Sequence, residues 1–178
     1  MKKALFFLIL FTVIFGSAVY AQTPKVDITF AFTRLSGFST NQYAIWIEDS
    51  NGKLVKTLYA TKFTATGGYA KRPESIPTWV QKSGLKSLSK NEVDALTGAT
   101  PRTGNQSYSW DGKDKNGNVS PPGVYRIFLE ATVRAENRVL YSASFTLGTA
   151  AELEPAPEYT GTDTKDRHMI DKVKIRVR

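Results

Sequence analysis

Residues 110–125 give the clearest indication of the fold. Their sequence is Trp110-Asp111-Gly112-Lys113-Asp114-Lys115-Asn116-Gly117-Asn118-Val119-Ser120-Pro121-Pro122-Gly123-Val124-Tyr125. Its two aromatic residues, Trp110 and Tyr125, flank a run of glycine, asparagine and aspartate. Glycine permits positive φ angles, and the carboxylates of Asp111 and Asp114 are suited to accept backbone hydrogen bonds inside a turn. We therefore expect a turn between two strands whose ends are anchored in a hydrophobic core by Trp110 and Tyr125.

The oxygen-bearing side chains of this turn raise a calcium loop as an alternative. The ligand spacing does not match one. Counting from Asp111 places Lys113 at the third position, and counting from Asp114 places Val119 where the loop glycine belongs. No glutamate closes either frame as a bidentate ligand. We expect a structural turn and no metal site.

Alternating apolar and polar residues on both sides of the turn predict β-strands. The period of two covers residues 26–33, 43–47, 54–59, 106–110, 124–134, 139–147 and 173–177. Asp49-Ser50-Asn51-Gly52 is typical of a hairpin turn, and Ala135-Glu136-Asn137 joins the two longest strands. About seven short strands separated by turns indicate an all-β fold, an immunoglobulin-like antiparallel β-sandwich.

A partly helical insertion interrupts the sandwich between about residues 63 and 104. Residues 73–81 read as one helical piece. Ser89-Lys90-Asn91-Glu92 has the capping-box spacing of a second helix, which we expect to end near Leu96 with Gly98 as its stop. Long ordered insertions often carry function, so this segment is the first place to look for a site.

Two further segments lie near the end of the chain. Residues 149–164 contain Pro155 and Pro157 and no apolar period, so we expect a proline-containing surface loop there. The last strand, residues 173–177, alternates apolar residues with lysine and arginine. We interpret its charged face as that of a protected edge strand, with an anion-binding patch as the alternative.

Residues 1–21 have the organisation of a secretory signal peptide. Lys2 and Lys3 precede an apolar stretch, and small residues lead to a cleavage site near Ala21. We expect residues 22–178 to form one domain that is periplasmic or secreted, without a transmembrane segment in the mature chain. The net charge of +8 falls to about +6 without the leader, and no nucleic-acid-reading motif is present, so we expect no nucleic-acid partner.

The chain has no cysteine and one histidine, His168. This composition excludes disulfides, thiolate metal sites, cysteine nucleophiles and sites that need two imidazoles. A lone histidine beside a strand is more often structural than catalytic. We expect no catalytic residues.

The turn resembles that of flagellar-hook-capping-type immunoglobulin-like domains, W-D-G-x-D-x-x-G-x-x-x-P-x-G-x-Y, and residues 48–55 are similar to the D-x-x-G-x-x-V hairpin of the same domains. With an internal T-G-A-T segment between these motifs, the order of elements resembles a family of predicted periplasmic proteins, domain of unknown function 2271. The resemblance covers nearly all of the mature chain. It implies the architecture and directs attention to the T-G-A-T segment.

Residues 94–100, Asp94-Ala95-Leu96-Thr97-Gly98-Ala99-Thr100, match D-x-x-[S/T]-G-A-T. This segment resembles the acceptor signature of exported flavoproteins, in which a flavin transferase joins flavin mononucleotide (FMN) through a phosphoester to the final threonine. The resemblance implies that Thr100 carries FMN and that Asp94, Thr97, Gly98 and Ala99 are recognition elements.

Two functions follow from these observations. In the first, the chain is an exported, non-catalytic accessory protein of an extracytoplasmic flavin-linked redox system. Its partners are a flavin transferase and membrane redox proteins, and the FMN is tuned by side chains such as Trp79 or Tyr69. In the second, it is a cofactor-free binding or structural module of the cell envelope. Gly98 then ends a helix, Thr97 and Thr100 hydrogen-bond locally, and Pro101 starts the return to the sheet.

Overall fold

Strands whose burial alternates from residue to residue build the first of two sheets. The computed structural model describes residues 24–37 and 41–178, so the predicted leader lies outside the described residues. In the order β5-β1-β10-β8, the first sheet is antiparallel throughout. Its strands are β1 (Val26–Phe32), β5 (Gly104–Trp110), β8 (Ala151–Leu153) and β10 (Ile170–Val177).

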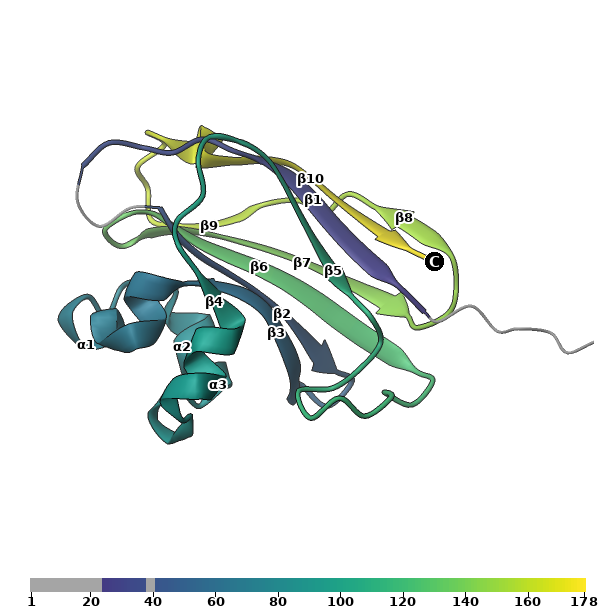
Figure 1. Cartoon of the computed structure of the whole chain (residues 1–178). Coiled ribbons are helices and arrows are strands. Elements are labelled where there is room, and N and C mark those ends of the chain that lie inside the picture. Colours follow the sequence, from purple (N-terminus) through teal and green to yellow (C-terminus); the bar gives the residue numbers. More distant parts are fainter. Residues whose placement is uncertain (1–23, 38–40) are drawn as a thin grey trace, which may run out of the picture.

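The second sheet stacks face to face on the first (Figure 1). Its order is β4-β3-β2-β6-β7-β9, and its strands are antiparallel except for the parallel pair β3 and β4. The strands are β2 (Gln42–Asp49), β3 (Leu54–Thr61), β4 (Thr97–Gly98), β6 (Val124–Arg134), β7 (Asn137–Thr146) and β9 (Glu158–Thr160). The predicted immunoglobulin-like β-sandwich with a partly helical insertion is confirmed.

The turn between β5 and β6 is anchored as its sequence predicts. Trp110 and Tyr125 are buried in the core between the sheets, with ring centroids 5.2 Å apart. The Trp110 indole donates to the Lys113 carbonyl at 2.7 Å, and the Asp114 carboxylate accepts the backbone N–H groups of Asn116 and Asn118, each at 2.8 Å. The turn is therefore held by its own side chains.

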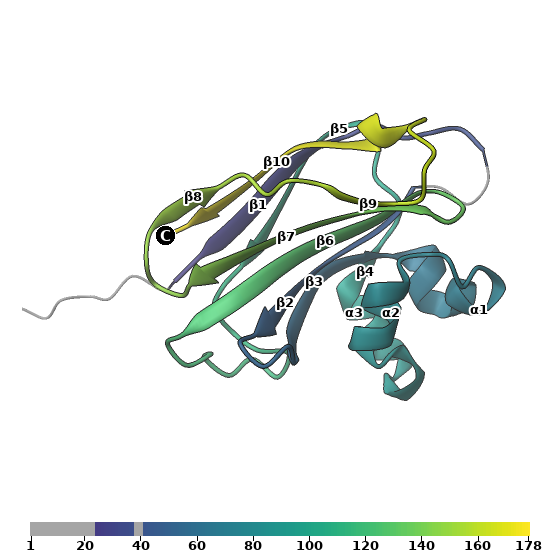
Figure 2. The same cartoon turned by 180° about the vertical axis from the view of Figure 1, so that it is seen from behind.

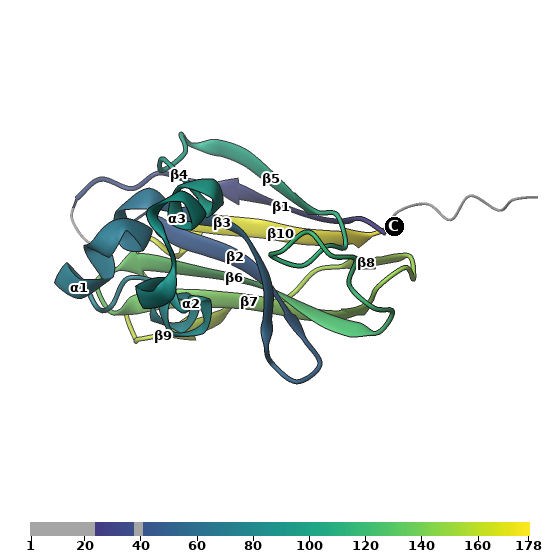
Figure 3. The ribbon, with the colours of Figure 1, turned by 60° about the horizontal axis from the view of Figure 1, so that its bottom comes forward.

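The helical insertion forms a third layer on the outer face of the six-stranded sheet (Figure 3). Trp46 of β2 and Trp79 of the insertion are fully buried in this second core. As a result, β2 is buried on both faces, whereas the alternating pattern predicted one. The elements of the insertion are a π-helical turn (Thr64–Gly68), α1 (Tyr69–Lys71), α2 (Pro77–Ser83), a 3₁₀ turn (Leu85–Ser87) and α3 (Lys90–Leu96).

Two polar side chains on the outer face of β6 attach the insertion to the sheet. Glu130, only 2% exposed, accepts the backbone N–H groups of Thr78 and Trp79 at 3.2 and 2.9 Å. Thr132 accepts the N–H of Ile76 at 2.9 Å. These bonds satisfy the free donors at the start of α2.

The structure corrects three expectations about elements. The helix predicted over residues 73–81 begins at Pro77, because Ile76 before it has a left-handed backbone (φ 42°). The segment 149–164 is not only a loop: Figure 2 shows β8 beside β10 and β9 beside β7. The last strand, β10, is not an edge strand, since β1 and β8 flank it.

A final 3₁₀ turn (Arg167–Met169) precedes β10. None of the helices in the described part of the chain has the length and apolar character needed to cross a bilayer.

Candidate functional site

The D-x-x-T-G-A-T segment begins on α3 and ends on the connection that crosses from one sheet to the other (Figure 1). The capping box predicted for α3 is confirmed: Ser89 Oγ accepts the Glu92 N–H, and the Glu92 carboxylate accepts the Ser89 N–H at 2.8 Å. The helix ends at Leu96, as expected, but Gly98 is not its stop. Thr97 is already extended, because Thr97 and Gly98 pair with β3 as the short strand β4.

Gly98 has a different structural reason for being a glycine. A Cβ atom added there would lie 2.7 Å from Cε2 of Tyr59 on β3. The same tyrosine donates its hydroxyl to the carbonyl of Ala99 at 2.9 Å and approaches that of Gly98 at 3.3 Å. Tyr59 therefore packs against the backbone of the motif and holds it by hydrogen bonding.

The two threonine hydroxyls of the motif lie in different surroundings. Thr97 Oγ1 is enclosed and has no hydrogen-bond partner. Thr100 is half-buried. Within residues 24–37 and 41–178 its hydroxyl makes no hydrogen bond, and unlike the Thr97 hydroxyl it is not fully enclosed. The expected local hydrogen bonds of Thr97 and Thr100 are therefore wrong. Of the two hydroxyls, only that of Thr97 is fully enclosed.

The remaining residues of the motif are mostly at the surface. Asp94 is exposed and forms an ion pair with Lys62 at 3.6 Å, and Ala99 is exposed. Arg102 and Thr103, which follow on the same connection, are exposed as well. Small or solvated side chains thus surround the Thr100 position along the chain.

The structure removes Trp79 as a contact for a ligand at this site. Its side chain is fully buried between α2 and the sheet, where the indole donates to Thr57 Oγ1 at 3.1 Å. Tyr69 is half-buried and lines a different hollow, between α1 and α2. The aromatic residue that contacts the motif is Tyr59, which strand periodicity marked only as part of a strand.

Tyr59 belongs to a cluster of three tyrosines. Its ring centroid lies 4.9 Å from that of Tyr43 on β2 and 4.9 Å from that of Tyr108 on β5. Burial raises the pKa of each of the three hydroxyls above its ordinary value. The cluster is therefore uncharged at neutral pH. Because its members come from three strands, the pairing of the strands was needed to find it.

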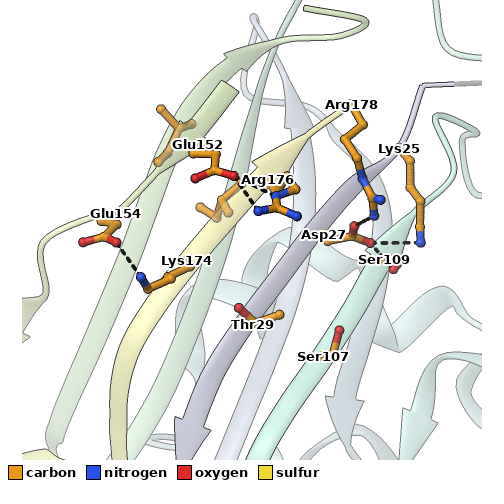
Figure 4. Close-up of a pocket in the computed structure, with 12 residues that line it drawn as sticks. Lys25, Asp27, Thr29, Ser107, Ser109, Glu152, Glu154, Lys174, Arg176 and Arg178 are labelled. Atoms are coloured by element: carbon orange, nitrogen blue, oxygen red, sulfur yellow. Dashed lines mark hydrogen bonds and ion pairs between the residues drawn. The ribbon is translucent and has the colours of Figure 1, made fainter. Parts of the chain in front are cut away.

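A second candidate site is a hollow of about 480 Å³ on the outer face of the four-stranded sheet (Figure 4). Asp27 accepts hydrogen bonds there from Lys25, Ser109 and Arg178. Partial burial acts to raise the pKa of Asp27, but these three hydrogen bonds outweigh it and hold the pKa below its ordinary value. The carboxylate stays ionised and pairs with both basic neighbours, Lys25 and Arg178.

The basic residues of β10 in this hollow are also paired. Arg176 contacts Glu152 at 2.6 Å, and Lys174 contacts Glu154 at 2.9 Å (Figure 4). Acidic residues that follow β7 in the chain thus balance the charge of the last strand. The hollow has side chains of both signs and a row of hydroxyls from Thr29, Ser107 and Ser109, which differs from a bare anion-binding patch.

His168 is exposed and is not part of either site. The neighbouring Asp166 forms an ion pair with Arg134 at 2.7 Å, so its carboxylate is already engaged. Among the described residues, no group of three or more histidine and acidic side chains has the geometry to hold a metal ion.

Comparisons with known proteins give information on the family of the chain and do not test its motifs. A structure of truncated FlgD (monoclinic form) from the human pathogen Helicobacter pylori (strain 26695) is 14% identical, with 86% of this chain and 84% of that chain covered and a TM-score of 0.36. That score is too low to inform function. No curated protein sequence matches the chain. The family model "Predicted periplasmic protein (DUF2271)" matches residues 23–162, and the chain belongs to this family.

Proposed function

We propose that this protein is an exported, non-catalytic accessory of an extracytoplasmic flavin-linked redox system and that Thr100 accepts FMN as a phosphoester. The observation that carries the proposal is the state of the Thr100 hydroxyl, which is not fully enclosed and makes no hydrogen bond with the described residues. A nucleophilic oxygen in that state needs no existing bond to be broken before it attacks phosphorus. The enclosed hydroxyl of Thr97 lacks this access.

The residues around Thr100 fit a flavin phosphoester. Gly98 and Ala99 precede it without bulky side chains, and Arg102 lies exposed two residues later, so that positive charge is available near a phosphate. Tyr59 holds the backbone of Gly98 and Ala99 in place. The chain therefore supplies an ordered, accessible acceptor.

In the proposed attachment reaction, a flavin dinucleotide donates the FMN group. Thr100 Oγ1 forms a bond to the flavin-side phosphorus, the pyrophosphate bond breaks, and a nucleoside monophosphate leaves with the bonding electrons. The hydroxyl proton passes to a base of the transferase. FMN, when attached, supplies electron transfer, and this chain's own residues anchor it and set its access to partner proteins.

The test is intact-mass measurement of the full chain co-expressed with a flavin transferase in an exporting host. We expect the mass to increase by one FMN less one water. Thr100→Ala abolishes the adduct and Thr100→Ser retains it. The matched control is Thr103→Ala, which should keep the adduct. Thr103 is an exposed threonine on the same connection, and its hydroxyl accepts the Arg34 N–H. An adduct that persists in Thr100→Ala overturns the proposal.

The second function, a cofactor-free envelope module, is favoured by the charged hollow on the four-stranded sheet. A polar hollow with both signs of charge suits a polar partner. No adduct under conditions that label a known acceptor would favour this function over the flavin carrier.

A further inference from the structure

Two tyrosine rings are partly open on the flank of the sandwich where β3 and β5 contact each other. Tyr43, in the middle of the cluster, is fully buried, whereas Tyr59 and Tyr108 are half-buried. The hydroxyls of Tyr43 and Tyr108 are hydrogen-bonded to each other at 2.6 Å. The cluster is thus held from the inside, and its two outer members, Tyr59 and Tyr108, are partly exposed.

The acceptor threonine lies next to this surface. Tyr59 Oη is 2.9 Å from the carbonyl oxygen of Ala99, the residue before Thr100. Standard peptide geometry then places Thr100 Cα within about 6 Å of the Tyr59 hydroxyl. The phosphate and five-carbon ribityl chain of an attached FMN are longer than this gap. A flavin on Thr100 therefore reaches the tyrosines without strain in its tether.

We infer that Tyr59 and Tyr108 form the contact surface for the isoalloxazine ring of an FMN attached to Thr100. The inference rests on the proposed function and deepens it, because it assigns the noncovalent part of the site to named side chains. Aromatic rings stack on one another in offset or edge-to-face arrangements, and both phenols are uncharged at neutral pH. The isoalloxazine ring, at the free end of the tether, then has a defined binding position.

This contact has a spectroscopic signature. A neutral phenol in contact with a photoexcited isoalloxazine transfers an electron to the ring and receives it back, with no net chemical change, so the flavin fluorescence is quenched. Phenylalanine cannot do this, yet it fills nearly the same volume. The substitution Tyr→Phe therefore separates the contact from the packing of the core.

The test is the fluorescence lifetime of FMN on the full-length, exported protein. We expect the parent to be quenched relative to free FMN, and the lifetime to rise several-fold in Tyr59→Phe combined with Tyr108→Phe. Tyr159→Phe is the matched control, since Tyr159 is half-buried on β9 at the other edge of the six-stranded sheet. Its lifetime should equal that of the parent.

Each single variant, Tyr59→Phe and Tyr108→Phe, is measured as well, so that the test stands if the double variant does not fold. Loading is checked by intact mass on the same samples. Full loading with an unchanged lifetime in all these variants overturns the inference and leaves the proposed function intact. No adduct on the parent overturns the proposed function and the inference with it.

Discussion

Gly98 belongs both to the proposed acceptor motif and to the packing of the fold. Its backbone lies against the Tyr59 ring, and an added Cβ would be 2.7 Å from Cε2. We expect Gly98→Ala to lower the free energy of unfolding by about 1–3 kcal/mol, the usual cost of overpacking. Urea melts of Gly98→Ala in the parent and in a Tyr59→Ala background check this. An equal cost in both backgrounds would show that the tyrosine is not the cause.

Asp114 gives the turn between β5 and β6 a dependence on pH. The hydrogen bonds from the Asn118 and Asn116 backbones hold the pKa of its carboxyl below the ordinary value of 3.8. A carboxyl with a lower pKa in the folded state contributes stability above its unfolded pKa and loses it as the pH falls through the folded pKa. Below about pH 4 the parent should therefore lose more stability than Asp114→Asn. Thermal melts of the two proteins that fall in parallel as the pH decreases would contradict this.

At the scale of elements, the attachment of α2 depends on Glu130. Glu130→Ala leaves the N–H groups of Thr78 and Trp79 without their acceptor and removes the partner of Arg138. We expect a loss of about 3 kcal/mol in the free energy of unfolding. Glu158→Ala, on exposed β9, should change it by less than about 0.5 kcal/mol. Chemical denaturation compares the two, and similar losses would refute the attachment.

The sequence allowed the long strands and α3 to be predicted, because each has a local signal. Strands β6 and β7 have a sustained period of two, and Ser89 and Glu92 stand at the spacing of a capping box. Three short strands were missed. Strands of two or three residues, such as β4, β8 and β9, have too few positions for a period and form only because a longer strand offers its edge.

Periodicity also could not reveal which outer faces are covered. Glu130 and Thr132 stand at outward-facing positions of β6, where a polar residue ordinarily meets water. The insertion covers them, so they become buried acceptors for its backbone. Trp79 illustrates the same limit. The sequence suggests that it lies near a ligand, whereas in the structure it is part of a second core beneath the insertion.

For the whole molecule, stability depends on the core between the two sheets. Trp110 is fully buried there, with Tyr125 and Phe145 around it at centroid distances of 5.2 and 6.1 Å. We expect Trp110→Ala to cost about 3–5 kcal/mol, and we expect a cost in the same range for Tyr125→Ala because that side chain is also buried. Thermal unfolding measures this. Midpoints that match the parent would contradict the packing described for this turn.

The candidate site combines information of two kinds. The proposed acceptor motif is contiguous in the chain, so residues 94–100 could be identified from the sequence. The tyrosines beside it, Tyr43, Tyr59 and Tyr108, come from three strands and two sheets, and only the folded chain brings them together. A local motif is thus predictable, whereas the tyrosine surface that we propose for the flavin depends on strand pairing.

Peptide-level mass spectrometry of the exported protein, after exposure to a flavin transferase and its flavin donor, tests whether Thr100 is the acceptor. Fragmentation should locate the FMN phosphoester on the hydroxyl of Thr100 in the peptide that contains residues 94–102. An unmodified peptide, or an FMN located on Thr97 or on Thr103 of the neighbouring peptide, would contradict the claim that the Thr100 hydroxyl is the acceptor.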